Sequence, residues 1–256
     1  MKSLSFGSLA ATAAALMLLG ADLLWIHAKA DHQDSLTFSN TMTWGAEFAA
    51  QRDTETHFPA ELLAPITLPP PPQNSSKETR AELDLLKSYR ALRTPEKMKE
   101  ILSERTPAGI RLGNYTVAEY TDKKGKFPAT ARLLDESLKD LTILMFQQKA
   151  KFNRVRPSLL APDIDPAIEI PGHPAYPSGH STQTHFVAYV LGELMQNRKA
   201  EFVAKADAVA KNREIAGLHY PSDSAAGVLL AQQFFAIMMQ NTEFQRLLAD
   251  AKREWR

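Results

Sequence analysis

The sequence predicts an all-α protein in which one set of helices surrounds a common core. Apolar residues recur at three- and four-residue spacing through most of the chain after residue 76, as they do on the buried faces of helices. The alternating Val, Ile and Thr runs that indicate strands are absent. Prolines fall at 69–72, at 95 and through 152–177, where they mark an extended segment, a helix start and a loop.

Composition excludes several classes of protein. Of the 256 residues, 44% are apolar and 23% are charged, which is close to the globular average and argues against disorder of the whole chain. Lys and Arg total 30 against 29 Asp and Glu, for a net charge of +1, so the chain is no polycation made to bind nucleic acid. It contains no Cys, which excludes disulfides, thiol nucleophiles and Cys-based zinc sites.

The N-terminus carries the only stretch apolar enough to enter a bilayer, which excludes a protein with several membrane spans. Lys2 precedes an apolar run over 4–20, and Ala28-Lys29-Ala30 offers a small-x-small cleavage site. We therefore expect residues 1–30 to be a signal peptide, or alternatively an uncleaved N-terminal anchor. Export from a bacterial cytoplasm, in a chain without Cys to oxidise, predicts a periplasmic protein.

The remainder divides into a lead-in and a helical domain. Residues 31–75 form a mostly irregular, Pro-rich lead-in with LPPPP at 68–72 and a short helix near Ala60–Leu63. Residues 76–256 form the domain. Its helices are expected at 76–93, from Pro95 onward, at 128–151 (the longest), and after the loop 152–177 at 179–197, 199–216, 222–240 and 242–255.

Three short segments carry residues suited to chemistry. They read Lys149-x6-Arg156-Pro157, Pro177-Ser178-Gly179-His180 and Asn212-Arg213-x5-His219-x3-Asp223. Taken singly, each is ordinary: a basic helix end, a helix cap, and a helical side-chain pair four residues apart. His173 and His185 are expected to be structural or loop residues. It is the order and spacing of the three segments together that favour a functional site.

These segments resemble the three-part signature of the type 2 phosphatidic acid phosphatase superfamily, which includes bacterial nonspecific acid phosphatases and vanadium haloperoxidases. That signature is Lys-x6-Arg-Pro, Pro-Ser-Gly-His and Ser-Arg-x5-His-x3-Asp, and Asn212 departs from it at the Ser. LPPPP and the tail 244–254 resemble the secreted class A acid phosphatases in particular, whereas 158–160 lack the aromatic residues common there. The resemblance implies a helical bundle of the acid phosphatase/vanadium-dependent haloperoxidase type.

A phosphate-binding site explains why these residue types belong together. A phosphate monoester carries up to two negative charges, and its transition state spreads charge over three equatorial oxygens. Lys149, Arg156 and Arg213 can supply fixed positive charge. Ser178 can donate its hydroxyl proton. The amide of Gly179 lies at a predicted helix N-terminus, where anions bind.

The resemblance also implies a division of labour among the remaining side chains. His219 would be the nucleophile that forms a phosphohistidine, and Asp223 would fix its tautomer. His180 would be the general acid that protonates the leaving group. Since one imidazole must be neutral and the other protonated, a bell-shaped pH profile with an acidic to near-neutral optimum is expected.

The predicted function is metal-independent hydrolysis of phosphate monoesters through a phosphohistidine, by a broad-specificity acid phosphatase that needs no cofactor. The expected partners are small-molecule phosphate esters, with no nucleic acid, and a membrane only through an uncleaved N-terminal segment; homo-oligomer formation is left open. Alternatives are a vanadate-dependent haloperoxidase, a periplasmic lipid or pyrophosphate phosphatase, and a non-catalytic phosphate or metal module. The zinc version of the last would use His173, His180, His185, His219 and Asp223.

Overall fold

The computed structural model describes residues 26, 27 and 29–255, and it confirms the all-α prediction. Most of the expected export segment 1–30 lies outside the described residues. The helices are α2 (Phe38–Thr41), α3 (Ala46–Arg52), α4 (Ala60–Leu63), α5 (Lys77–Ser88), α6 (Pro95–Ser103), α7 (Val117–Thr121), α8 (Pro128–Phe152), α9 (Pro157–Leu160), α10 (Gly179–Leu194), α11 (Lys199–Ile215), α12 (Pro221–Met238) and α13 (Thr242–Lys252). Two short strands, β1 (Arg111–Leu112) and β2 (Tyr115–Thr116), pair antiparallel.

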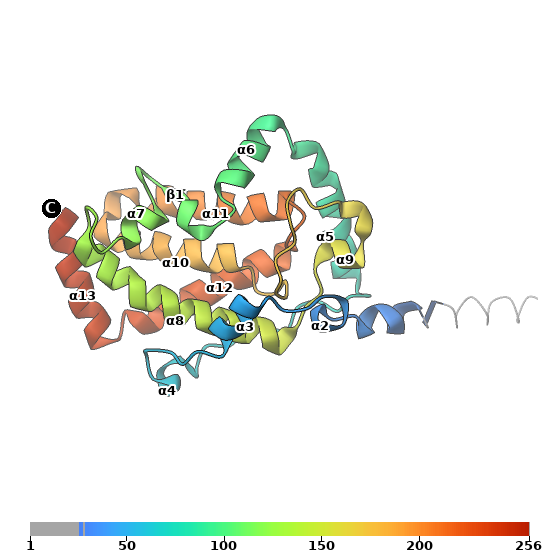
Figure 1. The fold of residues 1–256 in the computed structure, drawn as a ribbon, viewed down its shortest axis with the longest axis horizontal. Coiled ribbons are helices and arrows are strands. Elements are labelled where there is room, and N and C mark those ends of the chain that lie inside the picture. Colours follow the sequence, from blue (N-terminus) through green and yellow to red (C-terminus); the bar gives the residue numbers. More distant parts are fainter. Residues whose placement is uncertain (1–25, 28, 256) are drawn as a thin grey trace, which may run out of the picture.

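Helix α10 is the centre of the bundle (Figure 1). It packs against α11, α12 and α8, and α13 lies across α8 at the far end from α2 and α9. A helix that is apolar on every side belongs in an interior. Along α10 this is the case, because Phe186, Val187, Ala188, Val190 and Leu191 are all fully buried.

Local signals in the sequence set where these helices begin. Pro occupies the first turn of α6, α8 and α12, where its missing N–H is not needed. The side chains of Ser76, Thr94 and Asn241 accept backbone N–H bonds at the starts of α5, α6 and α13, as preferred N-caps do. For this reason the observed starts lie within about two residues of the predicted ones.

The lead-in is more ordered than the sequence suggests. The helix expected near residues 60–63 is present as α4, but α2, α3 and the helical stretch 29–35 were not foreseen. These pieces are too short to be stable alone and depend on the bundle. The buried carboxylate of Asp140 on α8 accepts the amides of His57 (2.8 Å) and Phe58 (2.6 Å). The amide of Gly45 binds the carbonyl of Gly172 (2.8 Å).

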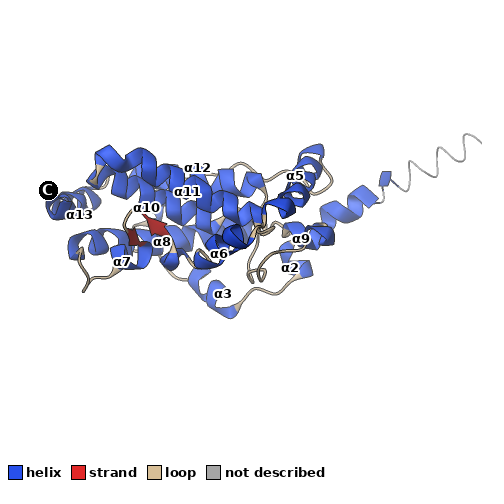
Figure 2. Ribbon diagram, turned by 90° about the horizontal axis from the view of Figure 1, so that it is seen from above, coloured by secondary structure: helices blue, strands red, loops and turns tan. Residues whose placement is uncertain are grey.

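Two smaller differences concern other expected loops. The β1–β2 hairpin, red in Figure 2, and the five-residue α7 were not predicted, since neither is long enough to show a hydrophobic period. The proline-rich segment 152–177 is mainly loop, as expected, but contains α9 and a short 3₁₀ turn. Within the part of the chain described, no helix has both the length and the apolar character needed to cross a membrane.

A glycine on α12 allows that helix to approach the start of α10. A Cβ at Gly227 would lie 2.7 Å from the carbonyl oxygen of Ser178. We expect Gly227→Ala to lower the free energy of unfolding by about 1–3 kcal/mol, because the backbone must shift to make room. Denaturant unfolding measures the change.

A second glycine provides the matched control. A Cβ at Gly179 in the first turn of α10 would lie 3.4 Å from the terminal methyl of Met145, which is an ordinary van der Waals distance. Gly179→Ala should therefore leave stability unchanged or raise it by about 0.4–1 kcal/mol. Equal destabilisation by both variants would contradict the packing argument.

Candidate active site

A pocket of about 690 Å³ opens at the N-terminal end of α10. Its walls come from α3, the loop after α6, the middle of α8 and the segment 168–173. Five of its lining residues carry basic side chains, namely Arg105, His173, His180, Arg213 and His219. Three of the five, His180, Arg213 and His219, belong to the predicted site, so the fold brings segments far apart in sequence to one pocket.

His219 lies just before α12 and is oriented by a carboxylate on it. Its Nδ1 is 3.2 Å from Oδ2 of Asp223, and the same oxygen accepts the amide of Tyr220 at 2.9 Å. A carboxylate can only accept here, so Nδ1 carries the proton and Nε2 keeps its lone pair. Gly217, with φ of +76°, makes the turn that leads from α11 to His219.

Arg156 contacts the other ring nitrogen of His219. Its Nη1 is 3.1 Å from Nε2 of His219 and also donates to the carbonyl of Leu218 (2.9 Å). Its Nε and Nη2 contact the carbonyl and Nδ1 of His173, both at 3.0 Å. Burial lowers the pKa of Arg156 to about 10. The guanidinium therefore stays charged beside the predicted nucleophile.

Lys149 is placed differently from the expected direct phosphate ligand. It is fully buried, and its ammonium donates to the carbonyls of Pro174 (2.8 Å), Ala175 (3.2 Å) and Pro177. It is not among the lining residues. Burial and the charge of Arg156 hold its pKa well below the usual value. In this structure Lys149 fixes the loop that leads into α10.

The start of α10 supplies the next predicted residues. Ser178 is the N-cap, and its hydroxyl oxygen faces the amide of Ser181 (3.5 Å) rather than the pocket. Gly179 and His180, whose amides belong to the first turn, line the pocket. Nε2 of His180 donates to the carbonyl of Glu104 at 2.9 Å. Burial and the charge of Arg213 lower the pKa of His180 to about 3.

The guanidinium of Arg213 uses only some of its hydrogen-bond donors. Its Nη2 binds the carbonyl of Ile101 at 2.9 Å and lies 3.7 Å from the carboxylate of Glu104. Its Nε and Nη1 are buried and have no hydrogen-bond partner. Leaving buried charged donors unpaired is costly. A residue that lines a pocket and retains two such donors is suited to bind an anion.

Asn212, the departure from the family signature, does not line the pocket. Its amide nitrogen donates to Glu104 (2.8 Å) and its amide oxygen accepts from Lys97 (3.1 Å). Glu104 also binds Lys205 at 2.6 Å. The substitution thus directs this side chain to a buried carboxylate that sits beside Arg213.

Sequence reasoning missed two residues of the site. His173, expected to be structural, lines the pocket and contacts Arg156. Arg154 is almost fully buried and bonds to Asp223 at 2.6 Å. The Arg-x-Arg spacing directly after a helix end could have indicated it, because side chains two apart in an extended segment share a face.

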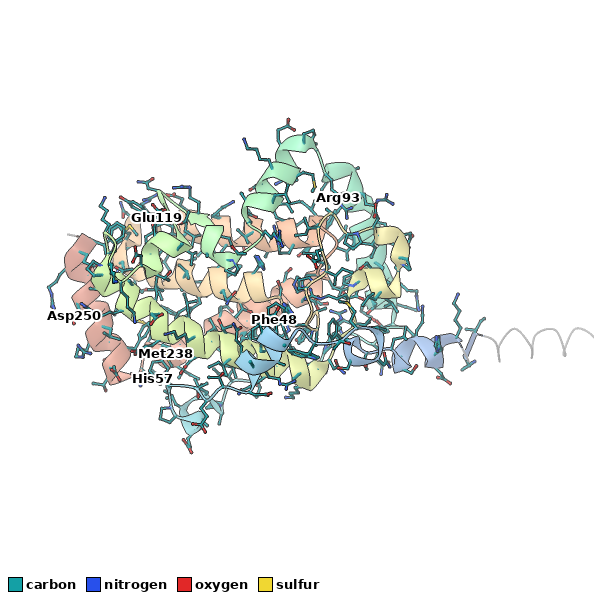
Figure 3. The ribbon with its side chains drawn as sticks, viewed as in Figure 1. Phe48, His57, Arg93, Glu119, Met238 and Asp250 are labelled. Atoms are coloured by element: carbon teal, nitrogen blue, oxygen red, sulfur yellow. The ribbon has the colours of Figure 1, made fainter. Side chains whose placement is uncertain are left out.

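The histidines of the zinc alternative do not form a metal set among the described residues. Within that part of the chain, the three side chains close enough to hold an ion are His57, Glu136 and Glu243, which lie outside the pocket. Figure 3 shows His57 well away from Phe48, which is one of the pocket residues. His185 binds the carbonyl of Ser181 and Asp207 instead.

Comparison with known proteins identifies the class. Residues 138–246, which include every predicted site residue, match the model of the PAP2 superfamily. This segment of the chain is therefore similar to the PAP2 superfamily. Its fold resembles that of the first bacterial vanadium-dependent iodoperoxidase, with a TM-score of 0.61 and 17% identity over 80% of this chain and 61% of that one.

The relatives in sequence are bacterial acid phosphatases. A non-specific acid phosphatase of Providencia stuartii is 25% identical over 195 residues, 73% of this chain and 79% of its own. An acid phosphatase of Zymomonas mobilis is 27% identical over 136 residues, half of each chain. A non-specific acid phosphatase of Salmonella typhimurium is 32% identical over 80 residues, 31% of this chain and 32% of its own. The family and these relatives support phosphatase activity.

Buried imidazoles with lowered pKa predict that anion binding takes up protons. Burial and nearby cations, Arg213 for His180 and Arg156 for His219, disfavour the imidazolium. A bound dianion opposes both effects and raises each pKa. Sulfate, which exchanges no proton of its own near neutral pH, should therefore bind more tightly as pH falls from about 6.5 toward 4, with uptake of about one proton. Calorimetry in buffers of different ionisation enthalpy measures the uptake. Binding with the same affinity across that range would contradict the electrostatics.

Proposed function

We propose that the protein is a metal-independent phosphatase that hydrolyses phosphate monoesters through a phosphohistidine at His219. The observation that carries the proposal is the pairing of His219 with Asp223 on one side and Arg156 on the other. The unpaired donors of Arg213, in the same pocket, supply the anion site. A nucleophile with a fixed tautomer beside fixed cations is the arrangement that phosphoryl transfer requires.

In the first step the phosphoryl group takes over Arg156 Nη1 from Nε2 of His219, the freed lone pair on Nε2 attacks phosphorus, and the bond from phosphorus to the ester oxygen breaks. Asp223 stabilises the positive charge that develops on the imidazole. Arg156, Arg213 and the amides that start α10 bind the phosphoryl oxygens. Lys149 contributes through its charge, while its bonds to three carbonyls hold the loop in place.

His180 acts as the proton donor and then as the base. It gives its proton to the leaving oxygen, and it later takes one from the water that attacks phosphorus and breaks the bond to Nε2. Because burial and the cations around it lower its pKa to about 3, His180 needs the negative charge of the substrate to hold a proton near neutral pH. Substrate binding therefore prepares the acid.

The wider assignment follows from the relatives and the sequence. We propose broad specificity for small-molecule phosphate esters and a periplasmic location reached through residues 1–30. Hydrolysis should persist in EDTA, and vanadate should inhibit by mimicking the pentacoordinate phosphorus. The protein should not oxidise halide in vanadate and peroxide; halide oxidation without ester hydrolysis would instead support the haloperoxidase alternative.

The nucleophile assignment predicts that His219→Ala loses at least about 10³-fold in kcat on 4-nitrophenyl phosphate. Rapid acid-base quenching with labelled substrate should trap phosphate on the native protein and none on the variant. The control is His57→Ala, which removes an exposed histidine outside the pocket. Native rates in His219→Ala would refute the mechanism.

The general-acid assignment predicts a dependence on the leaving group. His180→Ala should lose about 10²–10⁴-fold on an alkyl ester such as glycerol 3-phosphate, whose alkoxide must be protonated as it leaves. The loss on 4-nitrophenyl phosphate should be at least tenfold smaller, since nitrophenolate leaves unaided. Steady-state kinetics with both esters measures the difference, and equal losses would contradict the role.

A further inference from the structure

The residue behind Asp223 carries an inference that goes beyond the predicted site. Arg154 Nη1 bonds to Oδ1 of Asp223 at 2.6 Å, while Oδ2 of the same carboxylate faces His219. The Arg154 side chain is 2% exposed and that of Asp223 is fully buried. One carboxylate is thus shared between an imidazole and a guanidinium, and almost none of either charged side chain is exposed to solvent.

Further contacts hold this guanidinium in place. Nη1 also donates to the hydroxyl of Ser222 (2.7 Å), and Nη2 donates to Glu82 on α5 (3.1 Å). The Cζ atom lies 3.8 Å from the centre of the Tyr220 ring. Glu82 in turn accepts the amide of Ser222 at 2.6 Å in the first turn of α12. Arg154 therefore joins three segments around the His219–Asp223 pair.

The backbone explains how two arginines reach opposite ends of that pair. Asn153 ends α8 in the left-handed region, with φ of 47°, and Arg156 has an extended backbone, with φ of −71° and ψ of 149°. Side chains two residues apart in an extended segment share a side, which lets Arg154 and Arg156 both reach the pair, while Val155 between them is buried. Arg156 contacts Nε2 of His219, and Arg154 contacts the far oxygen of Asp223.

We propose that Arg154 is a positioning residue that sets the basicity of His219 through Asp223. The proposal rests on the proposed function of His219. Arg154 bonds to Asp223 and offsets part of its charge, so the carboxylate orients the imidazole without drawing a second proton onto it. His219 then stays neutral, and nucleophilic, at mildly acidic pH.

The positive charges around the His219–Asp223 pair disfavour protonation of His219. Burial, Arg156, Lys149, His180 and Arg213 all hold the pKa of His219 well below its usual value. Asp223 is the acidic group in contact with it, and Glu82 lies one step further away, across Arg154. Removing the charge of Arg154 leaves Asp223 free to stabilise the imidazolium. The pKa of His219 must therefore rise.

The test compares Arg154→Met with Arg154→Lys by the pH dependence of kcat/KM. In Arg154→Met the acidic limb should move up by about one pH unit, with kcat at least tenfold lower at its optimum and KM changed by less than about threefold. Arg154→Lys keeps the positive charge but loses the planar guanidinium that bonds to two groups at once. The acidic limb of its pH profile should therefore stay near the native position. The position of a limb does not depend on how much of the variant has folded.

A second variant and a second measurement complete the design. Glu82→Gln removes the carboxylate charge that contacts Arg154 on the side away from Asp223. The acidic limb of its pH profile should therefore move to lower pH or remain unchanged. Nitrogen NMR of labelled histidine follows the titration of His219 without turnover. If the native protein hydrolyses no ester, the proposed function fails while the NMR titration still tests Arg154. The inference is overturned if Arg154→Met changes neither the acidic limb of the pH profile nor the titration of His219. It is also overturned if Arg154→Lys shifts both by as much as Arg154→Met does.

Discussion

The site depends on keeping several positive charges close together away from water. Lys149, Arg154, Arg156 and Arg213 are each at most 4% exposed. Burying even one such charge is expensive unless it is paired or hydrogen-bonded. The protein meets this requirement differently for each: three carbonyls for Lys149, carbonyls and imidazoles for Arg156, and two carboxylates for Arg154. Arg213 is the least satisfied of the four, because its Nε and Nη1 both lack a partner, whereas Arg154 leaves only its Nε unpaired.

The supports around these cations come mostly from backbone, which explains much of the local architecture. The loop 152–177 turns its carbonyls inward at residues 173, 174, 175 and 177, where two cations meet them. Its prolines restrict the loop and remove N–H donors that would compete there. The C-terminal end of α6 does the same for Arg213 and His180 through carbonyls at 101 and 104. Neutral acceptors stabilise the cations without cancelling the field that an anion senses.

The sequence predicted the bundle well because its helices carry strong local signals. Proline at the first turn and Ser, Thr or Asn caps fixed the helix starts, and the spacing of apolar residues fixed their type. The lead-in was harder to predict. Helix α3 has no buried residue of its own, so its sequence shows no apolar period. It forms where Phe48 packs against Phe146 and His173, contacts that local sequence cannot reveal.

The site shows the same division between local signal and tertiary contact. Motif spacing was enough to name His219, His180 and Arg213, all of which line the pocket. It could not show that Lys149 would turn to the loop carbonyls or that His173 would meet Arg156. Those outcomes depend on where the chain passes between the motifs.

Asn212, which stands where the motif has Ser, takes part in a buried hydrogen-bond network instead of lining the pocket. A short Ser would leave the carboxylate of Glu104 with one donor fewer, whereas the longer Asn reaches it at 2.8 Å. Glu104 holds His180 through its own carbonyl and lies beside Arg213. Through Glu104, Asn212 therefore supports two residues that line the pocket. Because Arg213 and His180 both line the pocket and both contact Glu104, the electrostatics of the pocket depend on where its charges are held as well as on how many there are.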